Sequence, residues 1–401
     1  MNHEEQLDLL TRRAEHIVPG EDLEQRLKEG KTLRVKLGVD PTAKDVTLGW
    51  AVPLRKLRDF QDAGHTPVLI VGDFTARIGD PSGKSETRPQ LSKEEVKANA
   101  AALFDQFWDI LDRERVEIRY NSEWLEPLDF ADLLRLTSHY TVAQMLERDD
   151  FAKRYREQRP ISIVEFMYPL AQAYDSVAVE ADVELGGNDQ LFNLLVGRDL
   201  QRAFEQQPQI ALTMPLLEGL DGVQKMSQSL GNYIGIRDKP EDMFGKVMSI
   251  SDELVVRYAE LATEMSVAEV SEVANAARSG GPAAGEAKRR VARAIVALYH
   301  GDDAAEAAEA AFDRTFKEHK TPDEILEAQI PPDAVDGEVV YLPRVLAELG
   351  LADSRSAARR LIGQHGVKIN GEPVGAEQVA VADLVGATIQ VGKRKFVRLR
   401  S

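Results

Sequence analysis

The 401-residue sequence contains no cysteine, so a disulfide framework and a thiolate-ligated metal site are both excluded. It has only seven histidines, and none of them shows the spacing of a metal-ligand pair, so we expect no protein-bound metal. No apolar run approaches the roughly 20 residues of a membrane span, and acidic residues interrupt positions 1–20, which argues against a signal peptide. We therefore expect a cytoplasmic protein without a membrane partner.

Acidic residues outnumber basic ones, 67 to 50, and the basic residues are unevenly distributed. The net charge is −17, which read alone argues against a polyanionic partner. Residues 341–401, however, carry ten Lys and Arg against five Asp and Glu, a local charge of +5, which leaves −22 on residues 1–340. A basic module at the end of an acidic chain predicts that a polyanion binds there.

The apolar patterns predict an α/β fold. Residues 33–39 alternate as in a strand, residues 48–63 have helical periodicity, and residues 67–74 contain an apolar run typical of a buried parallel strand. Together these three segments predict a β-α-β unit. Residues 181–202 and 210–217 predict further strands of the same open sheet, with loops at the strand ends.

The remaining segments set the predicted domain boundaries. We place the sheet domain at 1–230, with residues 92–160 as a charged helical insertion. Residues 231–330 predict a helical middle domain, since 241–318 are Ala-rich and helical, and residues 331–340 have the composition of a linker. Residues 341–401 predict a small α+β domain of two helices followed by short strands.

The most informative stretch is a Gly-flanked loop that contains Lys225-Met226-Ser227-Gln228-Ser229. A lysine on a flexible stem can follow phosphate oxygens as charge moves during a reaction. Glycines and hydroxyls let such a loop move and donate hydrogen bonds. A solvated surface turn is the alternative interpretation, so the other motifs decide between the two.

A second Gly- and Ser-rich loop, residues 79–85, follows the strand that ends near Phe74. It nearly matches a P-loop, but its glycines are four residues apart rather than five, and Pro81 removes a backbone donor from the phosphate cradle. We therefore reject a P-loop. Lys84 and Arg88 instead suit a departing pyrophosphate, with a structural turn as the alternative.

Six motifs occur in one order along the chain: Asp40-Pro41-Thr42, Thr47-Leu48-Gly49-Trp50, Ile78–Arg88, Tyr168-x3-Gln172-x2-Asp175, Gly186-Gly187-Asn188-Asp189-Gln190 and Lys225–Ser229. This series resembles the bacterial tyrosyl-tRNA synthetases, a family of class I aminoacyl-tRNA synthetases, over nearly the full chain. The resemblance implies a Rossmann-like parallel-sheet catalytic domain with a helical insertion, an α-helical middle domain and a small α+β RNA-binding domain. It also implies a homodimer.

The resemblance implies a tyrosine–tRNA ligase. Tyrosine and ATP would form tyrosyl-adenylate and pyrophosphate, and tyrosine would then pass to the 3′ end of tRNA(Tyr). ATP would be a substrate, and Mg²⁺ would arrive with it.

The resemblance also assigns a tyrosine site. Tyr168, Gln172 and Asp80 would bind the ammonium group, Asp175 would accept a hydrogen bond from the phenol, and Gln190 would orient the carboxylate. Lys36 stands where many relatives have a tyrosine that meets the phenol. The spacing by itself places Tyr168, Gln172 and Asp175 on one face of a helix, and a polar stripe at the border of a core is the alternative.

The ATP site that the resemblance implies consists of Gly38, Asp40, Gly49, Trp50, Gly187, Asp189, Met226 and Gln228. The glycines would leave room where backbone must approach the nucleotide closely. The implied catalytic residues, which would act on the phosphates, are Thr42, Thr47, Lys84, Arg88, Lys225 and Ser227.

Two positions depart from the family's pattern. The family's His-x-Gly-His signature reads Thr47-Leu48-Gly49-Trp50 here, and the second lysine of its Lys-Met-Ser-Lys-Ser signature is Gln228. Loss of one transition-state donor costs roughly 2.7–4 kcal/mol. Two alternatives therefore stay open: a catalytically weak paralogue that binds tyrosine or RNA, and a sibling synthetase for another aromatic amino acid such as tryptophan.

The basic tail supplies the candidate tRNA contacts, which are Arg355, Arg359, Arg360, Lys368, Lys393, Arg394 and Lys395. Its helix-helix-strand pattern looks like the small RNA-binding module shared with a ribosomal small-subunit protein. A solvated basic surface is the alternative. Against an acidic chain, we expect these residues to bind the phosphates of tRNA(Tyr).

Overall fold

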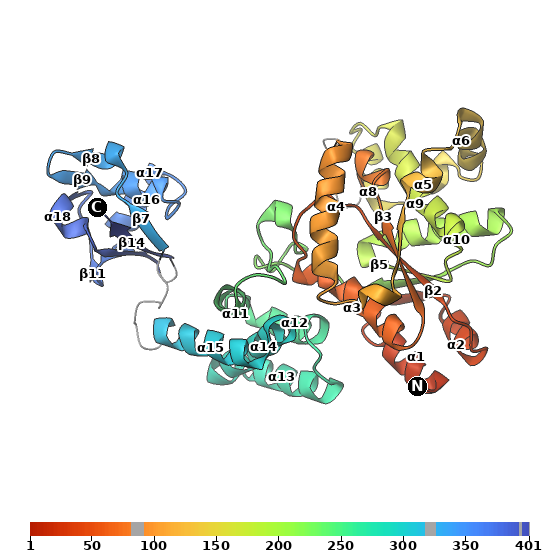
Figure 1. Ribbon diagram of the computed structural model, residues 1–401, viewed down its shortest axis with the longest axis horizontal. Helices are drawn as coiled ribbons and strands as arrows, with labels where there is room; N and C mark the ends of the chain where they lie inside the picture. Colours follow the sequence, from red (N-terminus) through yellow and green to blue (C-terminus); the bar gives the residue numbers. More distant parts are fainter. Residues whose placement is uncertain (82–91, 317–325, 393–394, 401) are drawn as a thin grey trace. The chain divides into compact units, whose positions relative to one another are not determined.

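The computed structural model describes residues 1–81, 92–316, 326–392 and 395–400. Lys84, Arg88, Lys393 and Arg394 lie outside these ranges. The chain divides into two compact units, Met1–Ala305 and Glu306–Ser401, and Figure 1 draws them from red to blue along the sequence. In the described part of the chain, no helix has the length and apolar character needed to cross a membrane.

The first unit is built on a six-stranded sheet with the order β1-β6-β5-β2-β3-β4. Its strands are β1 (His16–Val18), β2 (Arg34–Val39), β3 (Thr66–Val71), β4 (Glu117–Tyr120), β5 (Val183–Gly187) and β6 (Ile210–Met214). Strands β2 to β6 pair in parallel, and β1 is antiparallel to β6. The chain runs from β2 outward to β4 and then returns to β5 on the other side of β2. The carboxyl ends of β2 and β5 therefore form the topological switch point, where such sheets bind ligands.

Three helices cover this sheet. Helix α3 (Leu48–Asp62) packs on β2 and β3, whereas α9 (Ile163–Ala178) packs on α10 (Leu191–Ala203), which in turn contacts β5 and β6 (Figure 1). The predicted β-α-β unit is confirmed because β2, α3 and β3 follow one another with β2 parallel to β3. In β3, Pro67 to Val71 are all buried, as expected of a central strand covered on both faces.

Short helices surround the sheet: α1 (His3–Thr11), α2 (Gly20–Lys28), α4 (Lys93–Phe107), α5 (Ser122–Leu125), α6 (Phe130–Thr137), α7 (Val142–Met145) and α8 (Asp149–Arg156). The predicted helical insertion over 92–160 differs from the structure at β4, because these four residues extend the sheet beside β3. Four residues are too few for an alternation of apolar and polar side chains to stand out, so the sequence does not reveal this strand.

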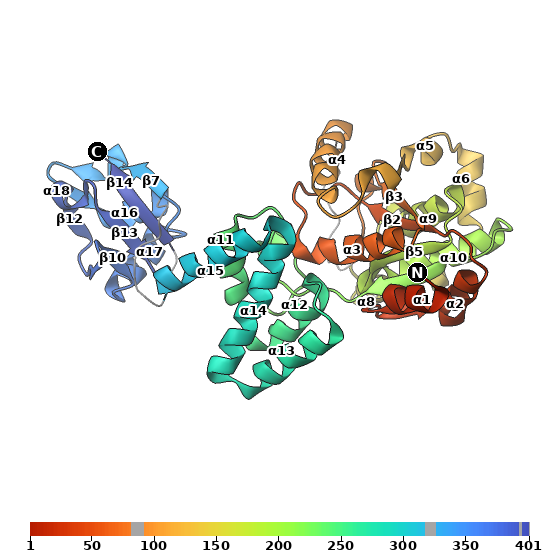
Figure 2. The same cartoon turned by 60° about the horizontal axis from the view of Figure 1, so that its bottom comes forward.

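After the sheet the chain forms a run of helices, which are α11 (Pro240–Met248), α12 (Val255–Ala262), α13 (Val267–Ser279), α14 (Gly281–His300) and α15 (Asp302–Phe316) (Figure 2). Helix α15 runs across the division between the two units. The predicted break near residue 280 is confirmed, because Gly280 adopts a φ of 70° between α13 and α14. Only glycine adopts such a backbone conformation without strain.

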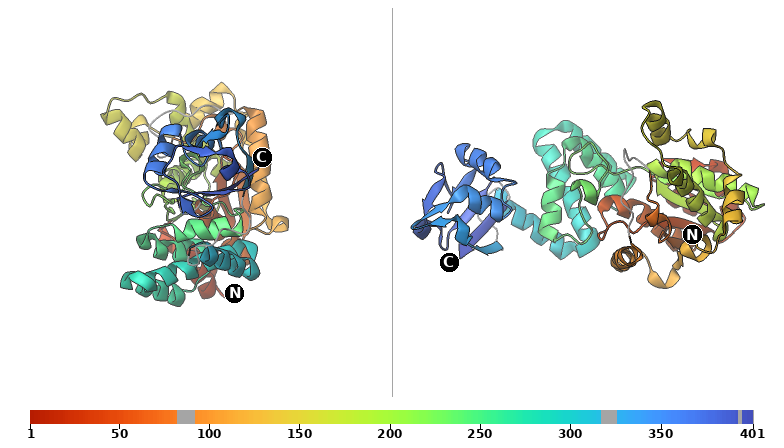
Figure 3. Two further views of the ribbon diagram at one scale, coloured as in Figure 1. Left: turned by 90° about the vertical axis from the view of Figure 1, so that its left-hand side faces the viewer. Right: turned by 90° about the horizontal axis from the view of Figure 1, so that it is seen from above.

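The second unit contains two small sheets, with the orders β11-β10-β13-β14-β7 and β12-β9-β8 (Figures 1 and 3). The strands are β7 (Leu326–Gln329), β8 (Val335–Asp336), β9 (Val339–Tyr341), β10 (Val367–Ile369), β11 (Glu372–Pro373), β12 (Gln378–Ala380), β13 (Thr388–Val391) and β14 (Lys395–Arg400). Helices α16 (Leu342–Glu348), α17 (Arg355–Gly363) and α18 (Val381–Leu384) pack on them.

The structure differs here from the predicted boundaries. Residues 331–340 contain β8 and part of β9 rather than a linker, and 326–329 form β7 rather than part of a helical domain. Strand β7 pairs in parallel with β14, far along the chain. The local sequence of 326–329 carries no signal for a partner at that separation. Residues 331–340 instead contain Pro and Gly, which are typical of a linker, and their strand β8 has only two residues.

Candidate active site

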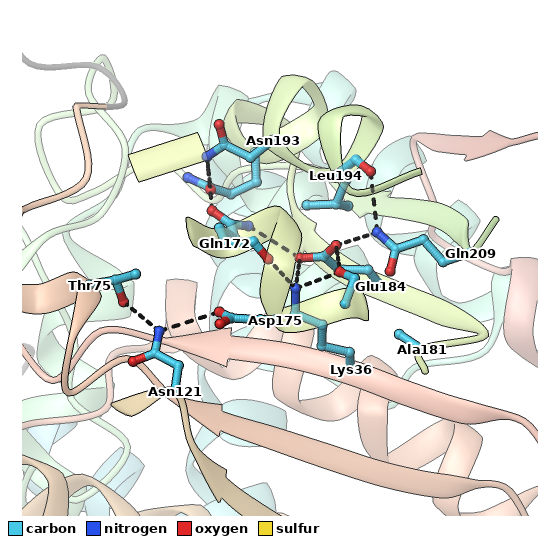
Figure 4. A network of polar contacts seen from close by, with 12 residues as sticks. Lys36, Thr75, Asn121, Gln172, Asp175, Ala181, Glu184, Asn193, Leu194 and Gln209 are labelled. Carbon is cyan, nitrogen blue, oxygen red and sulfur yellow. Dashed lines mark hydrogen bonds and ion pairs between the residues drawn. The ribbon is translucent and has the colours of Figure 1, made fainter. Parts of the chain in front are cut away.

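Helix α9 directs the three side chains of the predicted polar face toward the central strands. The Tyr168 hydroxyl donates to Asp40, which follows β2, and the Gln172 side chain donates to Glu184 on β5. Asp175 lies close enough to Lys36 of β2 for the positive charge of Lys36 to favour its ionised form. Figure 4 shows Lys36 bonded to the Gln172 carbonyl and to Glu184, and Asp175 bonded to Asn121 nearby. The predicted common face is confirmed, and its polar groups lie at the switch point of the sheet.

Asp40 is held in place by two hydroxyl groups. The Tyr168 hydroxyl donates to Asp40 Oδ2 at 2.8 Å, and Thr75 Oγ1 donates to Asp40 Oδ1 at 2.7 Å. A Cβ at Gly72 would lie 1.9 Å from Asp40 Oδ1, so only glycine leaves room for this carboxylate. Burial and the nearby Asp40 hold the pKa of Tyr168 well above its usual value, so its phenol remains a proton donor.

Asp175 is a buried carboxyl group with 3% of the residue exposed. Trp124 Nε1 donates to its Oδ1 at 2.8 Å, and Asn121 Nδ2 lies 3.4 Å from its Oδ2. Burial raises the pKa of Asp175 to about 7, although the positive charge of Lys36 opposes this shift. Asp175 therefore titrates near neutral pH.

Lys36 is fully buried, and all three of its ammonium protons have acceptors. Its Nζ donates to the Gln172 carbonyl at 2.8 Å and to Ser176 Oγ at 2.7 Å, and it pairs with Glu184 Oε1 at 2.9 Å (Figure 4). Lys36 and Glu184 are direct neighbours in the register of β2 and β5. The predicted contact of Lys36 with a substrate would require one of these three bonds to break.

Amide side chains connect Glu184 to Asp80. Gln172 Nε2 donates to Glu184 Oε1 at 3.2 Å, and Asn193 Nδ2 donates to Gln172 Oε1 at 3.0 Å. Gln190 Nε2 donates to Asp80 Oδ2 at 3.0 Å. The structure thus brings all six predicted tyrosine-site residues into one connected polar region.

The residues predicted to bind ATP lie along the neighbouring strand ends. Gly38 is exposed although it belongs to a central strand, and a Cβ built there meets no atom of the described chain within 4 Å. A Cβ at Gly49 would lie 3.3 Å from the Cβ of Met226, and one at Gly187 would lie 2.8 Å from Leu216. The loop around Met226 therefore packs on the start of α3.

The predicted phosphate loop is anchored at both sides of this region. Lys225 forms an ion pair with Asp189, and the Gln228 amide donates to the carbonyl of Asp45. The backbone N–H of Ser227 donates to Asn232 Oδ1 at 2.8 Å. The sequence motifs around Asp189, Gly49 and Lys225 are thus adjacent in space.

The two family departures have defined local roles. Thr47 is the N-cap of α3, and the Trp50 N–H donates to its Oγ1 at 3.2 Å. A hydroxyl that accepts this bond can still donate one. Trp50 is half-buried and Thr42 is exposed. Lys84 and Arg88 lie outside the described residues, so the structure places neither of them.

Sequence reasoning missed six contributors to this region, which are Thr75, Asn121, Trp124, Arg148, Glu184 and Asn193. Two of them carry a signal. Glu184 is a charged residue within an apolar strand, and such a residue requires a partner. Asn193 lies in the first turn of α10, three residues after the N-cap Gln190, so the two side chains can meet. Among the described residues, no group of three or more His, Cys, Asp or Glu side chains is arranged to hold a metal ion.

Basic side chains of the second unit gather on α17. Arg355, Arg359 and Arg360 are exposed there, and Arg359 Nε donates to the Tyr341 hydroxyl at 2.8 Å. Lys395 Nζ donates to the carbonyls of Gly350 and Leu351, each at 3.2 Å. Lys368 is half-buried on β10. The exposed arginines form a basic helix face, whereas Lys395 is tied to the loop after α16.

Comparison with known proteins identifies this architecture. Residues 28–317 match the family of tRNA synthetases class I (W and Y), and residues 342–383 match the S4 domain. The tyrosine--tRNA ligase of Moorella thermoacetica is 52% identical over 99% of this chain and 96% of its own. That of Geobacter sulfurreducens is 51% identical over 100% of this chain and 99% of its own.

Solved structures agree on the fold. The tyrosyl-tRNA synthetase of Archaeoglobus fulgidus, solved with L-tyrosine, has a TM-score of 0.62 at 25% identity and covers 76% of this chain and 99% of its own. A mitochondrial tyrosyl-tRNA synthetase of Aspergillus nidulans has a TM-score of 0.63 at 24% identity, over 79% and 94% of the two chains. The chain therefore belongs to the class I tRNA synthetases and, within that class, to the tyrosine--tRNA ligases, which are ATP-using enzymes.

Proposed function

We propose that the site at the carboxyl ends of β2 and β5 activates L-tyrosine with ATP and transfers it to tRNA(Tyr). The observation that carries this proposal is the buried carboxyl group of Asp175, placed between Trp124 and Asn121 in a chain related over its whole length to tyrosine--tRNA ligases. Trp124 and Asn121 fill only part of the acceptor capacity of this buried carboxylate. The site therefore favours a ligand that brings a further hydroxyl donor.

The phenol of tyrosine donates its proton to Asp175 in this proposal. Phenylalanine would remove only the donor that the ligand supplies, since Trp124 and Asn121 remain beside the carboxylate. Sites built to receive a substrate hydroxyl discriminate by roughly 10⁴ to 10⁵. The hydroxyl of a phenol lies at the far end of the side chain, whereas the N–H of indole lies at the side of a wider ring system. The spacing of Gln172 and Asp175 along α9 therefore favours phenol over indole. Lys36 acts through its bonds to Gln172, Ser176 and Glu184 rather than by touching the ligand.

The ammonium and carboxylate groups of tyrosine bind beside Asp80. Asp80 and the side-chain oxygen of Gln172 accept from the ammonium group, together with Tyr168, and Gln190 orients the carboxylate. Tyr168 already donates to Asp40, so its oxygen remains available as an acceptor. The side-chain oxygen of Gln172 faces Asn193, which matches an acceptor role for this group.

ATP binds over the glycines, because a side chain at Gly38 would enter the open space above β2. Gly49 and Met226 border the adenine, with Trp50 beside them, and Gly187 and Asp189 meet the ribose. Because Asp189 forms an ion pair with Lys225 in the free protein, ATP binding would release Lys225 to the phosphates.

The chemistry is an in-line displacement. A carboxylate oxygen of tyrosine attacks the α-phosphorus of ATP, and the bond to the bridging oxygen breaks and releases pyrophosphate. Thr42, Thr47, Lys225 and Ser227 donate to the phosphates, and Asp40 and Gln228 help to place the nucleotide and the loop. Lys84 and Arg88, which only the sequence motif assigns to this site, stabilise the pyrophosphate. Mg²⁺ enters with ATP.

In the second step a ribose hydroxyl of tRNA attacks the tyrosyl carbonyl, and AMP leaves. Neither step needs a covalent enzyme intermediate, so catalysis rests on positioning and electrostatics. The S4 unit binds the tRNA phosphates through the exposed arginines of α17, together with Lys368, Lys393, Arg394 and Lys395.

We also propose a cytoplasmic homodimer. Large apolar side chains are exposed on α6 to α9, namely Phe130, Leu134, Val142, Tyr155 and Ile163. Exposed apolar side chains concentrated in one segment are typical of a surface that another protein covers. A second copy is the occupant that family membership favours, and sedimentation of the purified protein tests it.

The first experiment is tyrosine-dependent exchange of labelled pyrophosphate into ATP without tRNA. We expect robust exchange with tyrosine and little with phenylalanine or tryptophan, which would also show that Thr47 and Gln228 sustain activation. Tyrosine binding without exchange would instead identify a catalytically weak paralogue. Exchange driven by tryptophan would identify a sibling synthetase.

A further inference from the structure

Four polar side chains form a closed ring beside the proposed tyrosine site. Arg148 Nη1 donates to Asn193 Oδ1 at 3.2 Å, and Arg148 Nη2 donates to Asp80 Oδ1 at 3.3 Å. Asn193 Nδ2 donates to Gln190 Oε1 at 3.0 Å, and Gln190 Nε2 donates to Asp80 Oδ2 at 3.0 Å. Arg148 and Asn193 are buried, so these bonds form in an environment that excludes most water.

The direction of every bond in the ring follows from its charged members. A guanidinium can only donate and a carboxylate can only accept. Arg148 therefore turns the oxygen of Asn193 toward itself, and the NH₂ of Asn193 must face the opposite way. Gln190 receives that NH₂ on its oxygen and must present its own NH₂ to Asp80. Neither amide can flip without placing two donors or two acceptors together.

The same logic extends to Gln172. Asn193 Nδ2 also donates to Gln172 Oε1 at 3.0 Å, while Gln172 Nε2 donates to the carboxylate of Glu184 at 3.2 Å (Figure 4). Glu184 is in turn paired with Lys36. The amide of Gln172 is thus fixed from both ends, with its oxygen on the side of Asn193.

Arg148 is the donor that sets the direction of the other hydrogen bonds in this network. It is the residue just before α8 (Asp149–Arg156), and its Nε forms an ion pair with Asp150 Oδ1 at 2.8 Å. Its guanidinium also lies 5.2 Å from the ring centroid of Phe151. These contacts fix the plane of the guanidinium, which then presents two N–H groups in a rigid fork to Asn193 and Asp80.

We propose that Arg148 is a positioning residue for the ammonium group of tyrosine. Arg148 holds Asp80 directly and holds Gln172 through Asn193, so that the acceptor oxygens of these two side chains rather than an NH₂ group are presented to the ammonium. This inference rests on the proposed function of the site. The alternative is that Arg148 leaves the ring and binds the substrate carboxylate itself.

The test compares three ligands that differ by one group. Dissociation constants are measured by calorimetry for tyrosine, for tyramine, which lacks the carboxylate, and for 3-(4-hydroxyphenyl)propanoate, which lacks the ammonium group. The variants are Arg148→Lys, which keeps the charge and loses the fork, and Arg148→Met, which removes all donors. Arg154→Lys is the matched control, because Arg154 is a buried arginine of α8 that pairs with Glu165 outside the ring.

A positioning role predicts that Arg148→Lys weakens tyrosine and tyramine by roughly tenfold or more and Arg148→Met by a larger factor. The propanoate should lose clearly less affinity than tyrosine and tyramine, because it has no ammonium group to be received and its carboxylate depends on the ring only through Gln190. Arg154→Lys should shift thermal stability without changing the ratio of the three affinities.

The opposite pattern, with weaker propanoate binding and unchanged tyramine binding, would show direct carboxylate contact and overturn the proposal. If the Arg148 variants lose affinity for all three ligands by the same factor, so that the ratio of the three dissociation constants equals that of Arg154→Lys, Arg148 has only a structural role and the proposal is wrong. The wild-type protein separates this result from the proposed function, since failure of the wild type to bind tyrosine at all would refute that function first.

Discussion

Asp175 offers the sharpest test of the physical reasoning, because its pKa lies near neutral pH. Burial raises the pKa of this carboxyl group from an unfolded value of 3.8 to about 7. The folded protein therefore holds a proton between these values that the unfolded chain has already released. The stabilisation is complete below pH 3.8 and is lost as the pH rises through about 7.

The magnitude follows from the size of the shift. About three pKa units correspond to about 4 kcal/mol of unfolding free energy over the whole range. Roughly 3 kcal/mol of this is lost between pH 5 and pH 8. Asp175→Asn removes the titrating group, so the stability of the wild type relative to this variant should fall by that amount over the same interval and then level off.

The assay is urea unfolding at fixed protein concentration, followed by tryptophan fluorescence at several pH values. All three tryptophans, Trp50, Trp108 and Trp124, belong to Met1–Ala305, so the signal reports that unit. The exposed Asp62→Asn variant controls for removal of a carboxylate. A stability difference between wild type and Asp175→Asn that stays constant from pH 5 to 8 would refute the raised pKa.

Ligand binding provides a second readout with the opposite sign. The phenol of tyrosine donates to the ionised carboxylate, so tyrosine affinity should rise as the pH increases through about 7. Phenylalanine brings no donor and should gain nothing, so discrimination between the two amino acids should increase over the same interval. In Asp175→Asn this pH dependence should disappear.

Three other changes have defined outcomes. Gly38→Ala should leave thermal stability unchanged, because its Cβ meets no described atom within 4 Å, but should raise the KM for ATP in pyrophosphate exchange without weakening tyrosine binding. Lys225→Met should slow exchange by ~10² or more through loss of a charge on the phosphates, whereas calorimetry should show unchanged tyrosine affinity. Combined replacement of Arg355, Arg359 and Arg360 by alanine should raise the KM for tRNA in aminoacylation and flatten its salt dependence, while exchange without tRNA stays at the wild-type rate.

The parts of the fold that sequence patterns predicted are those whose signals are local. Alternation over 33–39, helical periodicity over 48–63 and the apolar run near residue 70 lie within single elements, and the structure confirms β2, α3 and β3 there. The break at Gly280 is equally local, because it depends on one backbone angle. Strands β4 and β7 were not predicted, because they are short and their partners lie far along the chain. Strand β8 was not predicted because its two residues are too few to show a pattern, although its partner β9 follows directly.

The candidate site shows the same division. The i, i+4, i+7 spacing of Tyr168, Gln172 and Asp175 predicted a shared helix face, and the ordered motifs predicted the chemistry. Nothing in the local sequence around Lys36 indicated that its ammonium would be fully used by Glu184, Ser176 and the Gln172 carbonyl. That arrangement depends on the register of β2 and β5, which are separated by well over a hundred residues.

The sequence by itself determined the strongly patterned elements and the order of the motifs, and it predicted the groups that would touch tyrosine and ATP. Side-chain chemistry and short-range periodicity belong to single residues and short segments, so the sequence alone can show them. Only the tertiary structure decided which way those groups face. Arg148 comes from the segment before α8, Asp80 follows β3, and Asn193 lies on α10, yet one guanidinium orients the other two. Hydrogen-bond direction is a property of partners in space, and burial makes a wrong direction costly, so the fold sets the orientation that the sequence leaves open.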